Sequence, residues 1–249
     1  MEQQEQLLAE VQDAFGTIKV VQAGPYRFLE FGDAIEQSCV FMPDPTWLEY
    51  DYTRAMLLGA LLHEAPQSAL FLGLGGGSLT QACLRFLPLV DVEVIELRPD
   101  VPRLAESLLG FQSDPRITLR IGDALALLPA AEPADLIFID LYTDTGPSAG
   151  HLAWSFLEQC QRKLNPGGWL IINQWGTEGG QPLGAALLRG LFLRHYLECP
   201  LAEGNVVLMV PADLDQWVDF ERLAVRIEAL APRLGYSLAK LAQALRRAT

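Results

Sequence analysis

The stretch ALFLGLGGGSLTQACL, residues 69–84, decides the fold. An apolar run typical of a buried strand leads directly into Gly73, Gly75, Gly76 and Gly77, and a helical pattern follows. Glycine has no Cβ atom, so this backbone can adopt positive φ and lie against a ligand, beside the free N–H groups of the helix. The stretch therefore predicts a strand, a ligand-binding loop and a helix. Tight strand-to-helix packing without a ligand is the alternative.

Strand and helix patterns alternate from residue 67 onward. The predicted strands cover 68–73, 91–96, 116–121, 134–140, 168–173 and 205–211. The predicted helices cover 78–87, 99–109, 123–129, 150–164 and 180–196, and two more close the chain within 212–247. Because parallel strands need crossover connections, this alternation predicts a doubly wound, mostly parallel, Rossmann-like α/β sheet with helices on both faces.

The first part of the chain has a different pattern. Residues 2–14 predict an amphipathic helix, and 45–64 predict a proline-started helix. Between them we expect a small antiparallel sheet, with strands over 17–22, 26–31 and 34–41 and turns at Gly24-Pro25 and Gly32-Asp33. We therefore divide the chain into a small N-terminal β/helix region, 1–66, and a Rossmann-like domain, 67–249.

Composition predicts a soluble, cytoplasmic protein with a full core. Half of the 249 residues are hydrophobic, and no apolar run approaches the ~20 residues of a membrane span. The N-terminus is acidic and glutamine-rich, unlike a signal peptide. The four cysteines lie far apart and are expected to be buried and reduced, and no histidine spacing suggests a metal site.

The net charge of −13 argues against nucleic acid as a partner, because phosphate binding needs a basic face. The excess is uneven, since residues 1–66 carry eleven Asp and Glu against three Lys and Arg. An acidic region beside a site would attract cationic substrates, and a merely acidic soluble surface is the alternative.

Acidic residues follow the next three predicted strands at one edge of the sheet. Glu96 ends the second strand, Asp123 follows the third, and Asp140 closes the fourth. Ligands bind beyond the carboxyl ends of parallel strands. Glu96 is therefore expected to accept hydrogen bonds from both ribose hydroxyls of an adenosine, and Asp123, with the N–H of Ala124, to bind its adenine. Helix capping would explain one such acid, Asp123 above all, but explains a series of strand ends poorly.

Two other ligand classes fit less well. A nicotinamide fingerprint needs glycine where Ser78 stands, and carboxylates repel a diphosphate but stabilise a sulfonium. The order Ser78, Asp140, His195 matches an α/β-hydrolase, but Thr80 stands where the nucleophile elbow needs glycine. The pattern therefore favours S-adenosylmethionine or its decarboxylated form.

At this point the chain resembles a known family, the spermidine synthases, which are aminopropyltransferases with an S-adenosylmethionine-dependent methyltransferase type of fold. The matching stretches, in order, are YRFLEFGDAIEQS, LFLGLGGGSL, VEVIEL, RITLRIGDA, ADLIFIDLYTDTGP and HLAWSFLEQCQRKLNPGG. The resemblance implies a small-molecule amine or polyamine substrate and a homodimer formed through the N-terminal region. The residues it implies for cofactor binding are Gly73, Gly75, Gly77, Glu96, Asp123, Ala124 and Asp140.

The family's amine-binding acids are only partly kept. Its glycine-loop aspartate corresponds to Gly76, and of its D-x-x-D pair Asp140 remains while Thr143 takes the second place. Asp144 lies one residue later, and either replaces the lost acid or caps the turn. Whether aminopropyl transfer survives these changes stays open.

Other positions also depart from the family. Arg54-Ala55 stands where the family has a histidine-glutamate pair, and Gly16 where it has a glutamine near the cofactor. Arg54 would repel a substrate ammonium if it faced the pocket. An aromatic wall beside the sulfonium is expected from a further set, for which ordinary packing is the alternative: Tyr50, Tyr52, Tyr142 and Trp175.

The sequence thus predicts a spermidine-synthase-like transferase that moves an aminopropyl or methyl group to an amine. Asp140 and Asp144 are the predicted catalytic residues, because an amine of pKa near ~10 arrives protonated and needs a carboxylate to position it and accept its proton. A methyltransferase of another substrate and a non-catalytic nucleoside-binding relative are the alternatives.

Overall fold

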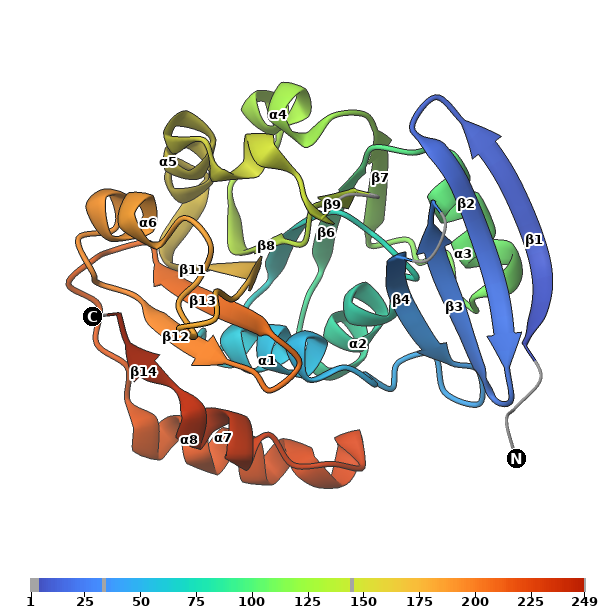
Figure 1. Cartoon of the computed structure of the whole chain (residues 1–249). Helices are drawn as coiled ribbons and strands as arrows, with labels where there is room; N and C mark the ends of the chain where they lie inside the picture. Colours follow the sequence, from blue (N-terminus) through green and yellow to red (C-terminus); the bar gives the residue numbers. More distant parts are fainter. Residues whose placement is uncertain (1–4, 33–34, 144–145, 249) are drawn as a thin grey trace.

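The computed structural model describes residues 5–32, 35–143 and 146–248. It contains an eight-stranded mixed sheet with helices on both faces, and a separate four-stranded antiparallel sheet near the N-terminus (Figure 1). The predicted fold class, a doubly wound, mostly parallel sheet with a small N-terminal β-region, is confirmed.

The central sheet has its switch point between β5 and β8, because β6 lies on one side of β5 and β8 on the other. Its strands, in spatial order, are β14 (Arg246–Arg247), β12 (Leu197–Pro200), β13 (Asn205–Pro211), β11 (Leu164–Trp175), β8 (Ala134–Ile139), β5 (Ser68–Leu72), β6 (Asp91–Glu96) and β7 (Ile117–Ile121). The strands from β11 to β7 are parallel, whereas β13 runs antiparallel to β11 and β12 to β13. Sheets of this kind bind ligands at the switch point.

Helices form a layer on each face of this sheet (Figure 1). One face is covered by α1 (Asp51–Ala60), α2 (Ser78–Phe86), α3 (Asp100–Leu108), α7 (Phe220–Leu234) and α8 (Ala239–Ala244). The other is covered by α4 (Ala124–Leu127), η1 (Leu128–Ala130), η2 (Ala149–Leu152), α5 (Trp154–Arg162) and α6 (Ala185–Leu191). Phe71 and Phe138 stack across β5 and β8, with ring centroids 4.4 Å apart, and so anchor the first face beneath the switch point.

The N-terminal sheet corrects one prediction. Its strands are β1 (Gln6–Asp13), β2 (Gly16–Ala23), β3 (Tyr26–Phe31) and β4 (Ile35–Phe41). The expected helix over 2–14 is wrong, because β1 pairs with β2 from Asp13 opposite Gly16 onward, in a tight hairpin. Cross-strand pairing and burial outweigh weak local helix propensity. Asp33 of the predicted Gly32-Asp33 turn lies outside the described residues.

Three further boundaries differ from the predictions. The helix expected over 45–64 begins only at Asp51, and that over 150–164 divides into η2 and α5. The helix expected over 180–196 shrinks to α6, after which Leu193 and Arg194 adopt positive φ. The chain then forms the unpredicted strand β12, because β13 on one side and β14 on the other offer it hydrogen-bonding partners.

Helix α1 belongs to the helix layer of the central sheet. Built onto Gly59, a Cβ atom would lie 3.0 Å from the Ile171 side chain of β11, so the glycine permits this close approach. Buried residues of the N-terminal sheet, including Val40, continue into the same apolar cluster as α1 and α2. The division at residue 66 stays a prediction.

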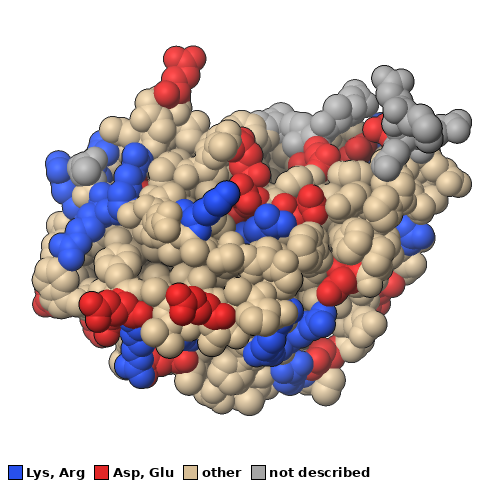
Figure 2. All heavy atoms as spheres, turned by 90° about the horizontal axis from the view of Figure 1, so that it is seen from below, with Lys and Arg blue, Asp and Glu red and all other residues tan. Residues whose placement is uncertain are grey.

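Among the described residues, no helix is both long and apolar enough to cross a membrane. Figure 2 shows basic and acidic side chains interspersed on the face seen from below. The negative excess is therefore not gathered into one patch on that face. All four cysteines are buried and unpaired, as predicted.

Candidate active site

A pocket of about 230 Å³ lies at the carboxyl ends of the parallel strands, at the switch point. Six of the predicted site residues line it: Gly73, Gly75, Glu96, Asp123, Ala124 and Asp140. Gly77 begins helix α2 but does not line the pocket, since its backbone packs against Phe111. Asp144 lies outside the described residues.

The glycine loop is pressed between two neighbouring elements. Gly73 has a φ of +97°, and a Cβ atom there would collide with the backbone oxygen of Asp140. Gly75 would likewise collide with the hydroxyl of Ser38, which accepts a 2.9 Å hydrogen bond from the N–H of Gly76. A Cβ atom on Gly76 would lie 2.8 Å from the Val40 side chain, so the loop has no room for the family's aspartate.

Alanine at Gly73 is expected to destabilise the protein by at least ~3 kcal/mol in urea unfolding, because left-handed strain of ~1–2 kcal/mol adds to the collision with Asp140. Gly167→Ala is the matched control, since Gly167 has a φ of +77° with open space around it. Its expected loss is the strain alone. Equal losses in the two variants would contradict a close-packed loop.

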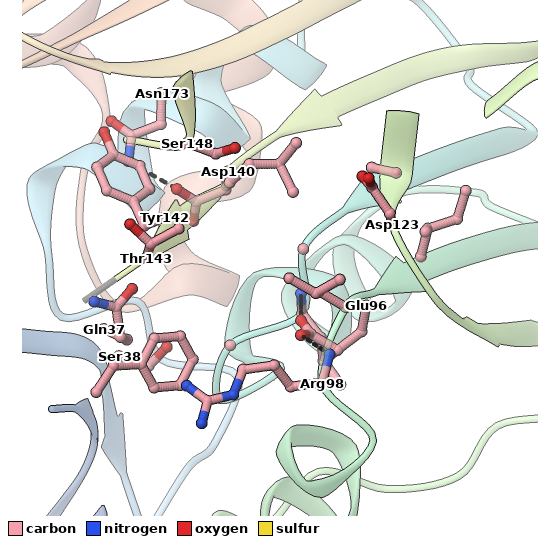
Figure 3. Close-up of a pocket in the computed structure, with 18 of the residues that line it drawn as sticks. Gln37, Ser38, Glu96, Arg98, Asp123, Asp140, Tyr142, Thr143, Ser148 and Asn173 are labelled. Atoms are coloured by element: carbon pink, nitrogen blue, oxygen red, sulfur yellow. Dashed lines mark hydrogen bonds between the residues drawn. The ribbon is translucent and has the colours of Figure 1, made fainter. Parts of the chain in front are cut away.

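Glu96 is the best-held acid of the pocket. It is 7% exposed, and its two carboxylate oxygens accept backbone N–H bonds from Leu74 (3.0 Å) and Arg98 (2.9 Å), the second drawn in Figure 3. Burial raises the pKa of Glu96, while Arg98 and these bonds lower it. Because a carboxylate has about four acceptor positions, each oxygen keeps one for a ribose hydroxyl.

Arg98 is a pocket residue that the sequence analysis missed. Its guanidinium donates two 2.8 Å hydrogen bonds to the Asp13 carboxylate and one of 2.7 Å to the carbonyl of Gly16. It also lies 4.4 Å from the Phe31 ring centroid. Arg98 thus ties the β1–β2 hairpin to the strand end that carries Glu96. Its position two residues after Glu96 was the sequence feature that could have identified it.

Asp123 caps a helix, which was the alternative to its predicted role in binding adenine. Its Oδ1 accepts the N–H of Leu125 at 2.9 Å, at the start of α4. The same residue and Ala124 line the pocket, so capping and adenine binding are compatible. The adenine role stays a prediction.

Asp140 lies at the end of β8, on the far side of the pocket from Glu96 and Asp123 (Figure 3). Its Oδ1 accepts a 2.9 Å hydrogen bond from Nδ2 of Asn173, whose Oδ1 accepts one of 2.8 Å from Nδ2 of Asn205. Burial raises the pKa of Asp140 to about 6, and the Asn173 bond opposes that rise. Both asparagines were missed. The signal was an amide inside the apolar strand LIINQW, because a buried amide requires partners.

Three of the four predicted aromatic residues line the pocket: Tyr52, Tyr142 and Trp175. Tyr50 instead stacks on Tyr52 from outside, with ring centroids 5.7 Å apart. The Tyr142 hydroxyl is buried, and the nearby Asn205 side chain lowers its pKa. Burial and the charge of Asp140 raise the pKa of Tyr142, so this hydroxyl is neutral and can act as a donor.

Arg54 does not line the pocket. Its Nε donates a 2.6 Å hydrogen bond to the carbonyl of Leu48, and its guanidinium lies over the rings of Tyr236 and Trp47. The repulsion considered for this residue therefore does not apply.

His151 supports the pocket from behind. It is fully buried, its Nε2 lies 3.2 Å from Nε2 of Gln174, and Gln174 in turn accepts the backbone N–H of Trp175. Since the Gln174 amide nitrogen is a donor, this arrangement needs a neutral imidazole with Nε2 as acceptor. Burial accordingly lowers the pKa of His151 to about 4.

This lowered pKa predicts an acid-sensitive fold. The unfolded chain binds a proton at His151 below pH 6.5 but the folded one only near pH 4, so stability is complete above 6.5 and falls as the pH drops through that window. The loss is about 2 kcal/mol by pH 5. His151→Asn keeps an acceptor and lacks this loss, which urea unfolding at pH 7 and 5 measures. Parallel pH dependence in both proteins would contradict the assignment.

The structure does not bring together the three residues of the hydrolase alternative. His195 lies in a separate pocket beside Trp217, and its Nδ1 contacts the carbonyl of Leu214, so Ser78, Asp140 and His195 form no triad. Within the described ranges, no group of three or more His, Cys, Asp or Glu side chains is arranged to hold a metal ion.

Comparison with known proteins gives a consistent set of relatives, although no family model matches the sequence. The polyamine aminopropyltransferase of Vibrio vulnificus is 26% identical over 241 residues, covering 93% of this chain and 80% of the relative. That of Nitrosomonas europaea is 32% identical over 219 residues, covering 83% and 66%. The eEF1A lysine and N-terminal methyltransferase of Danio rerio is 34% identical over 121 residues, covering 44% and 18%.

Solved structures show the same fold. A probable spermidine synthase from Corynebacterium glutamicum superposes with a TM-score of 0.72 at 18% identity, covering 90% of this chain and 86% of that one. Human methyltransferase-like protein 13, in complex with SAH, gives 0.65 at 24% identity, covering 75% and 93%. The strand order and the glycine loop, with these likenesses, define an α/β protein of the methyltransferase type. Within that class the chain is similar to polyamine aminopropyltransferases and spermidine synthases, as a divergent relative of that family.

Proposed function

We propose that the protein is a transferase that moves an aminopropyl group from decarboxylated S-adenosylmethionine to an amine. The observation that carries the proposal is the charge of the pocket. Four acidic side chains line it, namely Glu36, Glu96, Asp123 and Asp140, and burial raises the pKa of Glu36 to about 7. Its one lining cation among the described residues, Arg98, is paired with Asp13. Such a pocket favours a nucleoside with a cationic sulfur and a cationic amine acceptor.

The residues divide the ligand between two sides. Gly73 and Gly75 leave bare backbone for the sulfonium nucleoside, Glu96 offers acceptors to its ribose, and Asp123 faces the adenine end. On the other side, Asp140 lies with Tyr142 (Figure 3), whose ring centroid is 6.1 Å from that of Trp175, and the acceptor amine would approach there. The bound sulfonium supplies an electrophilic carbon: the amine nitrogen forms the new C–N bond as the C–S bond breaks, and its electron pair stays on sulfur.

Asp140 supplies the proton acceptor. The amine must lose one proton to expose its lone pair, and that proton passes to the carboxylate of Asp140. An aspartate of ordinary pKa would hold it poorly against an amine of pKa near ~10. Raising the pKa of Asp140 from 3.8 to about 6 narrows this mismatch. Two pKa units correspond to about 3 kcal/mol.

A methyltransferase is the second candidate function. The collision of a Cβ atom on Gly76 with Val40 excludes the loop aspartate that would hold an aminopropyl ammonium, whereas intact S-adenosylmethionine brings its own charged tail. The zebrafish relative is named a lysine and N-terminal methyltransferase. Its acceptor class, an amine, would suit Asp140 equally well.

Calorimetry with both sulfonium compounds, followed by turnover with putrescine and cadaverine, tests the proposal. Binding of decarboxylated S-adenosylmethionine with transfer to either diamine supports aminopropyl transfer. Binding of S-adenosylmethionine alone, with methylation of an amine, supports the second candidate. Binding without turnover of any amine would leave a non-catalytic nucleoside-binding protein and refute both. A dimer, expected from the resemblance, is tested by sedimentation.

A further inference from the structure

We propose that Asn173 and Asn205 are positioning residues that fix the charge state of Asp140. Asn205 holds the Asn173 amide in the orientation that presents an N–H, rather than a carbonyl, to the carboxylate. The effect on activity rests on the proposed role of Asp140 in transfer. The effect of the two asparagines on the protonation of Asp140 can be tested without turnover.

The three side chains come from three different strands. Asp140 follows β8, Asn173 lies on β11, and Asn205 opens β13. In the antiparallel β11–β13 register, Asn173 is opposite Val207, so Asn205 is its diagonal neighbour on the same face. Asn173 is 2% exposed, and its two hydrogen bonds, to Asp140 and from Asn205, are 2.9 and 2.8 Å long. The chain of bonds is therefore short, and its central residue is shielded from water.

The direction of these bonds follows from what each group can do. An ionised carboxylate only accepts, so Asn173 must turn its NH₂ group toward Asp140. Its carbonyl oxygen then points the other way and needs a donor, which Nδ2 of Asn205 supplies. An asparagine can rotate its amide by half a turn at little steric cost, so the donor on Asn205 selects the useful orientation.

Few other groups influence Asp140. The titratable side chains facing it are Tyr142 from β9 (Tyr142–Thr143) and Tyr52 from α1, and burial raises the pKa of both. The other acids of the pocket, Glu36, Glu96 and Asp123, are not among the causes that shift the pKa of Asp140. Both phenols are neutral, so neither supplies a charge. Within the described residues, the Asn173 bond is the one contact that lowers the pKa of Asp140 against burial.

This arrangement also defines the acceptor subsite. Since Asn173 occupies Oδ1 of Asp140, Oδ2 is the oxygen left for a substrate nitrogen. The hydroxyl of Tyr142 is buried at the same pocket, and the Asn205 side chain interacts with it. The two groups together suit one primary or secondary amine.

Asn205→Asp is the decisive variant. It keeps the size of the side chain but replaces the donor with an acceptor, so Asn173 must turn its NH₂ toward residue 205 and its carbonyl toward Asp140. The acidic limb of kcat/KM, expected near pH 6 in the wild type, should then move up by at least one pKa unit, a tenfold change in proton affinity.

Two controls separate amide rotation from added charge. Gln37→Glu places one more carboxylate at the same pocket, away from Asn173, and should shift the limb less. In an Asn173→Leu background, Asn205→Asp should add no more than Gln37→Glu does, because no amide remains to rotate. Shifts that are simply additive, or equal for Asn205→Asp and Gln37→Glu, would overturn the inference.

A readout independent of turnover completes the test. The Asp140 carboxyl band can be titrated by difference infrared spectroscopy of each protein against its Asp140→Asn counterpart, with melting curves confirming folding. An upward shift in the Asn205→Asp protein supports the relay even if no amine is a substrate. An unshifted band overturns the relay, whatever the outcome for aminopropyl transfer.

Discussion

Asp140→Asn is expected to lower kcat for transfer by at least ~10³-fold while leaving sulfonium binding within a few-fold. The amide is the size of the carboxyl and can still accept from Asn173 through its oxygen, but it cannot take the proton of the amine. Single-turnover assays with calorimetry separate the two effects. Retained transfer would refute the role of Asp140.

The same substitution is expected to stabilise the fold at neutral pH. The folded pKa of Asp140, about 6, lies above the unfolded value of 3.8, so its stabilising contribution is complete below 3.8 and lost as the pH rises through 6. Removing the buried charge should restore up to ~3 kcal/mol above pH 6 and nothing below pH 4. Urea unfolding between pH 4 and 8 measures this divergence.

Asp135→Asn is the matched control, at the other end of β8. Asp135 accepts hydrogen bonds from the N–H groups of Gln67 and Ser68 and from Asn165, which hold its pKa below the usual value despite burial. The sign is therefore opposite, and Asp135→Asn should destabilise the protein at neutral pH without touching the transfer site. Two variants with the same pH trend would show that strand position, not the local contacts, governs the effect.

Glu96→Gln is expected to weaken sulfonium binding by ~10²-fold or more. It removes charge-assisted bonds to ribose, worth ~1.5–3 kcal/mol each. It also turns an NH₂ group toward the backbone N–H of either Leu74 or Arg98. Calorimetry gives the affinity. A 2′-deoxy analogue should bind the wild type much more weakly than the natural nucleoside, but the variant almost equally.

Asp123→Asn provides the comparison within the same pocket. Asparagine keeps an oxygen for the N–H of Leu125 and for the adenine amino group, so the expected loss in affinity is below ~5-fold. Equal losses for Glu96→Gln and Asp123→Asn, or an unchanged response to the 2′-deoxy analogue, would exclude ribose recognition by Glu96.

The acidic residues of the cofactor site were predicted only from their positions at the ends of strands. Glu96, Asp123 and Asp140 each follow a parallel strand, and the carboxyl ends of such strands meet at one edge whatever the details of packing. Arg98, Asn173 and Asn205 escaped prediction because their roles depend on partners far along the chain: Arg98 bonds to Asp13, Asn173 to Asp140, and Asn205 to Asn173.

The N-terminal region shows the same limit for secondary structure. Local periodicity suggested a helix before residue 14, but pairing with β2 outweighed it and placed Asp13 beside Arg98. Arg54 was expected to repel a substrate ammonium if it faced the pocket. Its guanidinium instead lies over the rings of Trp47 and Tyr236, outside the pocket.

The sequence by itself determined the alternating sheet, the glycine loop and the acids at its edge, because strand periodicity and glycine chemistry act over a few residues. Only the tertiary structure decided which oxygen of Asp140 is occupied, which aromatic rings face the pocket, and why no aspartate fits at Gly76. Those properties depend on distances between segments far apart in sequence, which local patterns do not encode.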